Sequence, residues 1–99
     1  MKVENMTSSR GNKVANQFII TDEGRGALGN FIKRETFQSY TTIIAVITVW
    51  PDGLKVQLDK VSWACSTTTG KYRNIFLGES KKETLKKIES GEYILTNLN

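Results

Sequence analysis

The feature that most constrains the fold is the segment 41–58, which reads TTIIAVITVWPDGLKVQL. Its first part is rich in β-branched residues, which favour strands. The strand pattern is interrupted by Trp50-Pro51-Asp52-Gly53, where proline presets φ at the first turn position and glycine suits the left-handed residue of a G1 bulge. Because a second strand pattern follows at once, the segment predicts a tight β-hairpin.

The second arm of this hairpin alternates between apolar and polar residues. Leu54, Val56 and Leu58 fall on one face of the strand, and Lys55 and Gln57 fall on the other. We therefore expect Lys55 and Gln57 to face water or a partner. The first arm is apolar on both faces, so both of its faces should be covered.

Three shorter strand patterns lie outside the hairpin, at 17–22 (QFIITD), 35–40 (ETFQSY) and 92–98 (EYILTNL). The glycine-rich segment 22–30, DEGRGALGN, separates the first two patterns. Glycine loses more conformational entropy than other residues when it is ordered in a helix or strand, so this segment predicts an exposed and mobile loop.

A short helix is predicted near the C-terminal end. Ser80 and Glu83 have the spacing of a capping box, in which the serine hydroxyl accepts from the backbone N–H of the glutamate and the carboxylate reaches back. Gly91 follows the helical pattern and suits a helix end. Glu83 and Lys87 are spaced as an i, i+4 ion pair, which is typical of a solvated helix face.

The segment 66–78, STTTGKYRNIFLG, raises the question of whether it grips a phosphate or forms an ordinary capped helix. A phosphate-binding P-loop would need glycine where Cys65 stands and serine or threonine where Tyr72 stands. Neither requirement is met. The start of a helix nevertheless exposes free backbone N–H groups, and beside Lys71 and Arg73 these would suit an anion.

The favoured interpretation is a helix that is N-capped by Thr68 or Thr69 and ended by Gly78. Lys71 and Arg73 should be exposed on it. Its apolar side chains should pack against the face of the hairpin that bears Leu54, Val56 and Leu58, through Phe76 with Leu77, or through Tyr72 with Phe76 if the helix is rotated.

These elements predict an α+β fold, an antiparallel sheet of about five strands with one or two short helices packed on one face. Residues 1–13 are expected to be a flexible N-terminal segment, and residues 14–99 a single α+β domain. The longest apolar run, 43–47, is far too short to span a bilayer, and the polar start of the chain lacks the apolar region of a secretory signal. We therefore expect a cytoplasmic protein that does not enter a membrane.

The composition argues against several kinds of chemistry. The chain has no histidine, which removes the usual general base and the commonest metal ligand. Cys65 is the only cysteine and is expected to be a small buried hydrophobic residue. No carboxylate pair is evident for acid–base catalysis. We therefore expect no enzyme activity, no cofactor and no metal, and the net charge of +4 favours anionic partners without requiring them.

Several of these stretches resemble a family of small proteins encoded by phages and other mobile elements of Gram-positive bacteria. The resemblance rests on NQFIIT, on FQSY followed by IIA, and above all on W-x-x-S-x-T-T-G-K-Y-R-N-x-F-L-G-E followed by KKETLKKIESGEYILTNLN. It runs from about Gly11 to Asn99. The chain departs from the family pattern in the glycine-rich insert between Thr21 and Phe37 and at Ala64-Cys65.

The resemblance implies a small accessory protein made in the cytoplasm of a host cell, of the kind that redirects, inhibits or evades host machines such as restriction and CRISPR nucleases. The first hypothesis is a protein that binds a host protein or protein–nucleic-acid complex. Because arginine and aromatic residues dominate binding hot spots, its candidate contact residues are Arg25, Phe31, Lys33 and Arg34; the alternative for Phe31 is a place in the core. The alternative is direct nucleic-acid binding through Lys55, Lys60, Lys71, Tyr72 and Arg73.

Overall fold

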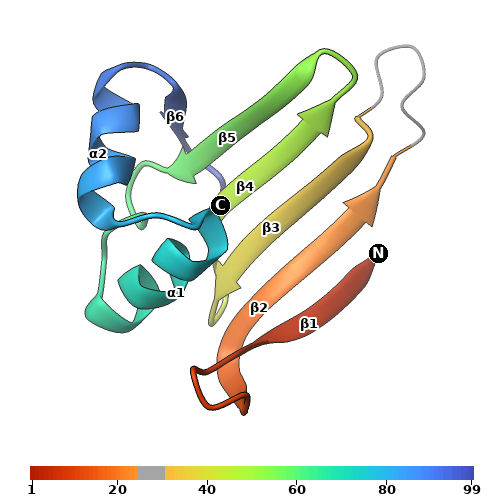
Figure 1. The fold of residues 1–99 in the computed structure, drawn as a ribbon, viewed down its shortest axis with the longest axis vertical. Helices are drawn as coiled ribbons and strands as arrows, with labels where there is room; N and C mark the ends of the chain where they lie inside the picture. The colour runs from red at the N-terminus through yellow and green to blue at the C-terminus, as the bar shows by residue number, and fades with distance from the viewer. Residues whose placement is uncertain (25–30) are drawn as a thin grey trace.

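A computed structural model describes residues 1–24 and 31–99 of the chain. Within these residues there are six strands and two helices (Figure 1). The strands are β1 (Lys2–Thr7), β2 (Lys13–Glu23), β3 (Lys33–Ser39), β4 (Thr42–Trp50), β5 (Gly53–Asp59) and β6 (Tyr93–Thr96), and the helices are α1 (Thr67–Leu77) and α2 (Lys81–Glu89). The predicted α+β class is confirmed.

The strands form one sheet in the order β1-β2-β3-β4-β5-β6. Neighbours from β1 to β5 are antiparallel, whereas β6 is parallel to β5. Parallel neighbours need a crossover connection, and α1 and α2 form it together. The described sheet therefore has one strand more than the expected five, and one of its pairs is parallel.

The N-terminal residues differ from the expectation of a flexible segment over 1–13. Lys2–Thr7 form β1, which pairs with β2, and Met6 is buried in the core. The Asn5 side chain also donates a hydrogen bond to the Val14 carbonyl oxygen at 3.0 Å. The segment itself, KVENMT, has little apolar character, so its order comes from pairing with β2 and not from a pattern of its own.

One face of the sheet packs against the helices and is called here the helical face. Phe37 of β3 lies opposite Ala45 of β4, which lies opposite Leu58 of β5, and all three are completely buried. The ring centre of Phe37 is 5.8 Å from that of Phe76 in α1. The core therefore lies between the central strands and α1.

The opposite face is called here the open face. Both helices are grouped at one end of the sheet, beside β6 and the end of β3 (Figure 1). Over residues 1–24 and 31–99, no helix lies on the open face. Because side chains alternate along a strand, this face carries the residues between those that reach the core, and Thr36, Val46 and Gln57 lie opposite one another on it.

The turn between β4 and β5 confirms the predicted tight hairpin. Trp50 pairs with Gly53, so Pro51 and Asp52 form the loop between them. Gly53 has a φ of 147°, a region that favours glycine, but it pairs directly with Trp50 instead of forming the bulge that we expected.

Helix α1 begins earlier than predicted. Its N-cap is Ser66, not Thr68 or Thr69, and the Ser66 hydroxyl accepts from the Thr69 backbone N–H at 3.0 Å. Thr69 turns towards the helical face instead, where its hydroxyl lies 3.0 Å from that of Ser39. Gly78 ends the helix with a φ of 70°, as predicted.

The residues that α1 buries correct one prediction. Tyr72 is buried and Phe76 and Leu77 are partly buried against the core, so residues from both predicted rotations contribute. Leu54 is 66% exposed, so its part of the hairpin lies outside this packing. The expectation that Arg73 is exposed is wrong, since only 1% of it is accessible.

The loop between β5 and α1 is organised by the buried Asp59. Its carboxylate accepts from the backbone N–H of Ser62 and of Leu98, each at 2.9 Å. Burial alone would raise the pKa of Asp59, but these hydrogen bonds outweigh it and lower the pKa below the usual value. Cys65, which the sequence predicts to be buried, is exposed because it precedes the helix cap and lies in this loop.

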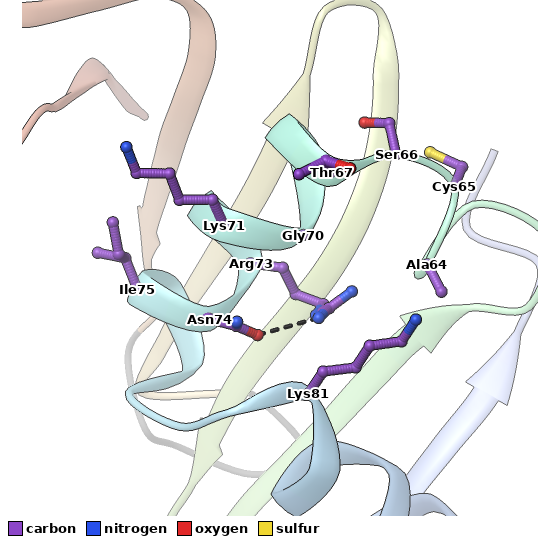
Figure 2. A pocket seen from close by; sticks show the side chains of 10 residues that line it. All are labelled: Ala64, Cys65, Ser66, Thr67, Gly70, Lys71, Arg73, Asn74, Ile75 and Lys81. Carbon is purple, nitrogen blue, oxygen red and sulfur yellow. Dashed lines mark hydrogen bonds between the residues drawn. The ribbon is translucent and has the colours of Figure 1, made fainter.

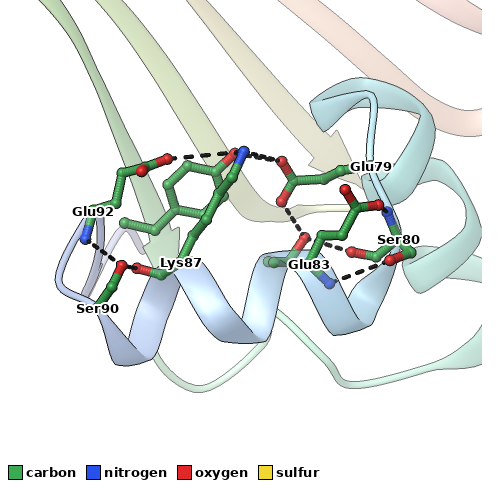
Figure 3. A network of polar contacts seen from close by, with 8 residues as sticks. Glu79, Ser80, Glu83, Lys87, Ser90 and Glu92 are labelled. Atoms are coloured by element: carbon green, nitrogen blue, oxygen red, sulfur yellow. Dashed lines mark hydrogen bonds and ion pairs between the residues drawn. The ribbon is translucent and has the colours of Figure 1, made fainter.

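A polar network joins the end of α1 to α2 and β6 (Figure 3). The Glu79 carboxylate accepts from the Thr84 hydroxyl at 2.6 Å, from the Tyr93 hydroxyl at 2.7 Å and from the Lys87 ammonium group at 2.8 Å. Only 5% of the Glu79 side chain is exposed. Three donors therefore satisfy a carboxylate that would otherwise be costly to bury.

The capping box of α2 is confirmed, since the Ser80 hydroxyl accepts from the Glu83 N–H and the Glu83 carboxylate accepts from the Ser80 N–H. The predicted ion pair between Glu83 and Lys87 is wrong. Lys87 pairs with Glu79 instead, because the Glu83 carboxylate is engaged at the N-terminus of the helix.

Candidate functional site

A row of polar side chains crosses the open face towards the β4–β5 turn. Arg34 of β3 lies opposite Thr48 of β4, which lies opposite Lys55 of β5. Their register places all three side chains on the open face. Arg34 is partly exposed and Lys55 is exposed, so two cationic groups reach solvent from neighbouring parts of one surface.

Two aromatic rings adjoin this row at the end of the sheet that holds the β4–β5 turn. The ring of Phe31 lies edge-to-face with that of Trp50, at 6.3 Å between ring centres and 86° between planes. The guanidinium carbon of Arg34 lies 4.2 Å from the Phe31 ring centre, within the range of a cation–π contact. Phe31, Arg34 and Trp50 are called here the open-face cluster.

The surrounding backbone explains why these side chains meet. Trp50 is the last residue of β4, and strand alternation places it on the same face as Thr48. The chain before β3 is held to the sheet by the Ile32 N–H, which donates to the Val49 carbonyl oxygen at 2.8 Å. Phe31 is thereby positioned beside Trp50.

The rest of the open face is a platform of small and apolar side chains. Thr36, Val46 and Thr48 form its buried middle. Longer and partly exposed side chains surround them, namely Phe18, Ile20, Gln38, Ile43 and Gln57. Such a surface offers rings, apolar area and two cations, a combination that suits recognition of a partner.

The structure brings together only part of the residue set predicted for partner binding. Phe31 and Arg34 are both in the open-face cluster. Lys33 has the opposite orientation on β3 and lies 3.8 Å from the Glu35 carboxylate. Arg25, and the loop prediction that includes it, fall outside the described residues.

Trp50 is the member of the cluster that the sequence analysis missed. The signal was present, because Trp50 follows Thr48 by two residues and Thr48 pairs with Lys55, which is expected to face water or a partner. From the sequence, Trp50 is expected only to form part of the turn.

The residues predicted for nucleic-acid binding do not form one surface. Lys55 is on the open face, whereas Lys71 is exposed on α1, which covers the helical face. Lys60 is exposed beyond the end of β5. Tyr72 belongs to the core and Arg73 is buried, so the prediction that these two offer a surface for nucleic acid is wrong.

Two observations bear on other classes of site. In the part of the chain that the structure describes, no three side chains of the metal-ligating types come together. None of the described helices is both long enough and apolar enough to span a bilayer.

Comparison with curated proteins and with solved structures found no match to this chain. Comparison with protein families found one described as a family of unknown function (DUF8033), whose sequence model matches residues 1–92. This match covers almost the whole chain. The protein is therefore a member of the DUF8033 family.

Proposed function

We propose that this protein is a small, non-enzymatic protein of a phage or other mobile element, and that it binds a host nucleic-acid-processing or defence complex in the host cytoplasm and inhibits or modulates it. The binding surface is the open face, with the open-face cluster as its anchor. The origin of the protein and the identity of its host target rest on the resemblance of its sequence to small mobile-element proteins.

The observation that carries the binding proposal is the open-face cluster itself. Aromatic residues and arginine are the residue types that contribute most to binding at protein interfaces. Here an arginine and two aromatic rings are held together by ring contacts on a partly exposed surface. A preformed anchor of this kind loses little side-chain entropy when a partner binds, which favours affinity.

The charges of the open face indicate the chemistry of the partner. Arg34 lies opposite Asp22 of β2, but within residues 1–24 and 31–99 no ion pair joins them. Arg34 and Lys55 are therefore available to a partner. We infer that this partner is a protein with an acidic contact surface, because opposite potentials guide association and fix the binding orientation.

Affinity capture from a lysate of a Gram-positive host, with and without nuclease treatment, tests this proposal. The informative variant is Arg34→Glu/Lys55→Glu, and the matched control is Lys82→Glu/Lys86→Glu, which makes the same charge change at exposed positions of α2. Thermal melts establish that both variants fold.

The expected result is a nuclease-resistant protein partner that the wild type and the α2 control capture equally. The open-face variant should capture at least about tenfold less, the loss expected when a binding hot spot is removed. Equal capture by the open-face variant would contradict the proposal.

Direct nucleic-acid binding is the second candidate, and one observation favours it. Phe31 and Trp50 lie beside Arg34 and Lys55, and aromatic rings with adjacent cations can stack bases and track the phosphate backbone of single strands. Gel-shift assays with single- and double-stranded DNA and RNA at about 50 and 200 mM salt test this candidate. Absence of binding at the lower salt concentration would eliminate it.

A further inference from the structure

A second surface feature lies away from the open-face cluster, where the loop before α1 and the start of α2 border an open pocket (Figure 2). Its volume is about 840 Å³, within the range typical of small-molecule sites. Residues 64–67 and the first turns of α1 form one wall, and Lys81, the first residue of α2, contributes another.

The charged residues that line this pocket are all cationic. They are Lys71 and Arg73 of α1 and Lys81 of α2. In the described part of the chain, none of the three forms an ion pair with a carboxylate. Figure 2 shows the Lys81 side chain extending to the side of α1 on which the Arg73 guanidinium lies. The Lys71 side chain extends from the opposite side of α1 (Figure 2), so the cations that converge are Arg73 and Lys81, and together they create a positive potential in the pocket.

Arg73 is the most informative of these cations because it is 99% buried. Its guanidinium donates to the Trp63 carbonyl oxygen at 2.6 Å and to Asn74 Oδ1 at 2.9 Å. Its Nε is buried and has no hydrogen-bond partner among the described residues. A buried positive charge without a paired anion is costly, so its retention beside a pocket suggests a ligand.

The N-terminus of α1 adds a further donor to the same pocket. Ser66 satisfies the Thr69 N–H, but over the described residues the N–H group of Thr67, which lines the pocket, makes no hydrogen bond. The first turn contains no acidic residue that would neutralise the positive end of the helix. Free N–H groups at a helix start favour anions.

We propose that this pocket binds the phosphate group of a small molecule. Two converging cations and the free Thr67 N–H group supply several donors, which suit the acceptor oxygens of a doubly charged group. The volume of the pocket also leaves room for an attached group about the size of a nucleoside. This site does not depend on the proposed host partner.

The test is a titration of the ¹⁵N-labelled protein, followed by NMR, with two probes that carry the same chemistry. Inorganic phosphate tests the bare anion, and adenosine 5′-monophosphate tests a phosphate with an attached nucleoside. Adenosine and sodium chloride at matched ionic strength are the controls. We expect saturable shifts of the Thr67 amide signal with at least one phosphate probe and with neither control. Equal affinity for both probes would assign binding to phosphate alone, and tighter binding of the nucleotide would assign the attached group a contact as well.

Three variants separate a built site from general attraction to a basic protein. Lys81→Gln should weaken binding on the order of tenfold, whereas Lys71→Gln, whose side chain extends away from Arg73 (Figure 2), and Lys86→Gln, on a part of α2 away from the pocket, should leave it nearly unchanged. All three lysines are exposed, so the variants should fold. No saturable shift with either probe, or equal weakening by all three variants, would overturn the proposal.

Discussion

Two neighbouring basic residues on α1 show how position decides what a side chain does. Lys71 is exposed, whereas Arg73 is buried and donates to the Trp63 carbonyl oxygen and to Asn74. The Arg73 guanidinium also lies 5.3 Å from the Trp63 ring centre. Arg73 therefore fixes the loop before α1, while Lys71 extends into solvent without a packing role.

Replacing these two residues should have unequal effects on stability. Arg73→Ala removes the donor to the Trp63 carbonyl oxygen and should lower the free energy of unfolding by about 1–3 kcal/mol. Lys71→Ala should change it by less than about 0.5 kcal/mol because the side chain is exposed. Urea unfolding of the two variants measures both values. Equal stability of the variants would show that the buried contacts of Arg73 contribute nothing.

Phe37 and Phe76 contact each other, but replacing each of them should lower the free energy of unfolding by a different amount. Phe37 is completely buried in the centre of the sheet, so Phe37→Ala should cost about 3–5 kcal/mol. Phe76 is only partly buried at the edge of the core, so Phe76→Ala should cost clearly less. Chemical denaturation of both variants compares the losses, and a larger loss for Phe76→Ala would mean that the core is centred on α1.

At the scale of elements, the Glu79 network connects α1, α2 and β6. Burial alone would raise the pKa of the Glu79 carboxyl, but hydrogen bonds from Lys87, Thr84 and Tyr93 outweigh it and hold the pKa below its usual value. Burial and the hydrogen bond to Glu79 raise the pKa of Tyr93 to about 12. The network is therefore complete when the carboxyl is ionised and the phenol is protonated.

These two shifts predict how stability depends on pH. The lowered pKa of Glu79 stabilises the fold above the ordinary carboxyl pKa of 4.5, and this contribution is lost as pH falls further. The raised pKa of Tyr93 contributes stability that is complete below pH 10.0 and is lost as pH rises towards about 12.

Two variants test which group causes the loss of stability at low pH, called here the acid limb, and at high pH, called here the alkaline limb. Glu79→Gln should make the acid limb less steep, with Asp59, whose pKa is also lowered, contributing to the slope that is left, and Tyr93→Phe should reduce the slope of the alkaline limb. Thermal melts from pH 3 to 11 measure both slopes. An acid limb that Glu79→Gln leaves unchanged would exclude Glu79 as its source.

The same scale shows which parts of the fold could be predicted. The β4–β5 hairpin and the capping box of α2 depend on residues close in sequence, and both were predicted. The inward orientation of Arg73 depends on the residue at which α1 begins, which is set by the cap at Ser66. The order of β1 and the parallel pairing of β6 depend on partners far along the chain. No local pattern specifies such contacts, so these features were missed.

The candidate site likewise combines features that the sequence predicts with features that depend on distant partners. Strand alternation was enough to place Lys55 on an exposed face, and composition was enough to nominate Phe31 and Arg34. The contact of Phe31 with Trp50 depends on two segments that meet only in the folded sheet. The residues of the site could therefore be nominated from the sequence, but their grouping could not.

At the scale of the whole molecule, the two faces of the sheet divide the work between stability and binding. The core and both helices are on the helical face, and the open face carries a cluster of arginine and aromatic side chains. Binding through the open face would leave the core and the Glu79 network undisturbed. The central claim is that a partner approaches from this side.

Site-specific photocrosslinking in host cells tests that claim most directly. A photoreactive amino acid is placed at Lys55 on the open face in one protein and at Lys86 on α2 in another, since both positions are exposed and neither belongs to the core. The account predicts that the protein carrying the probe at position 55 crosslinks to a discrete host protein, and that the protein carrying it at position 86 does not. Crosslinking from position 86 but not from position 55 would contradict it.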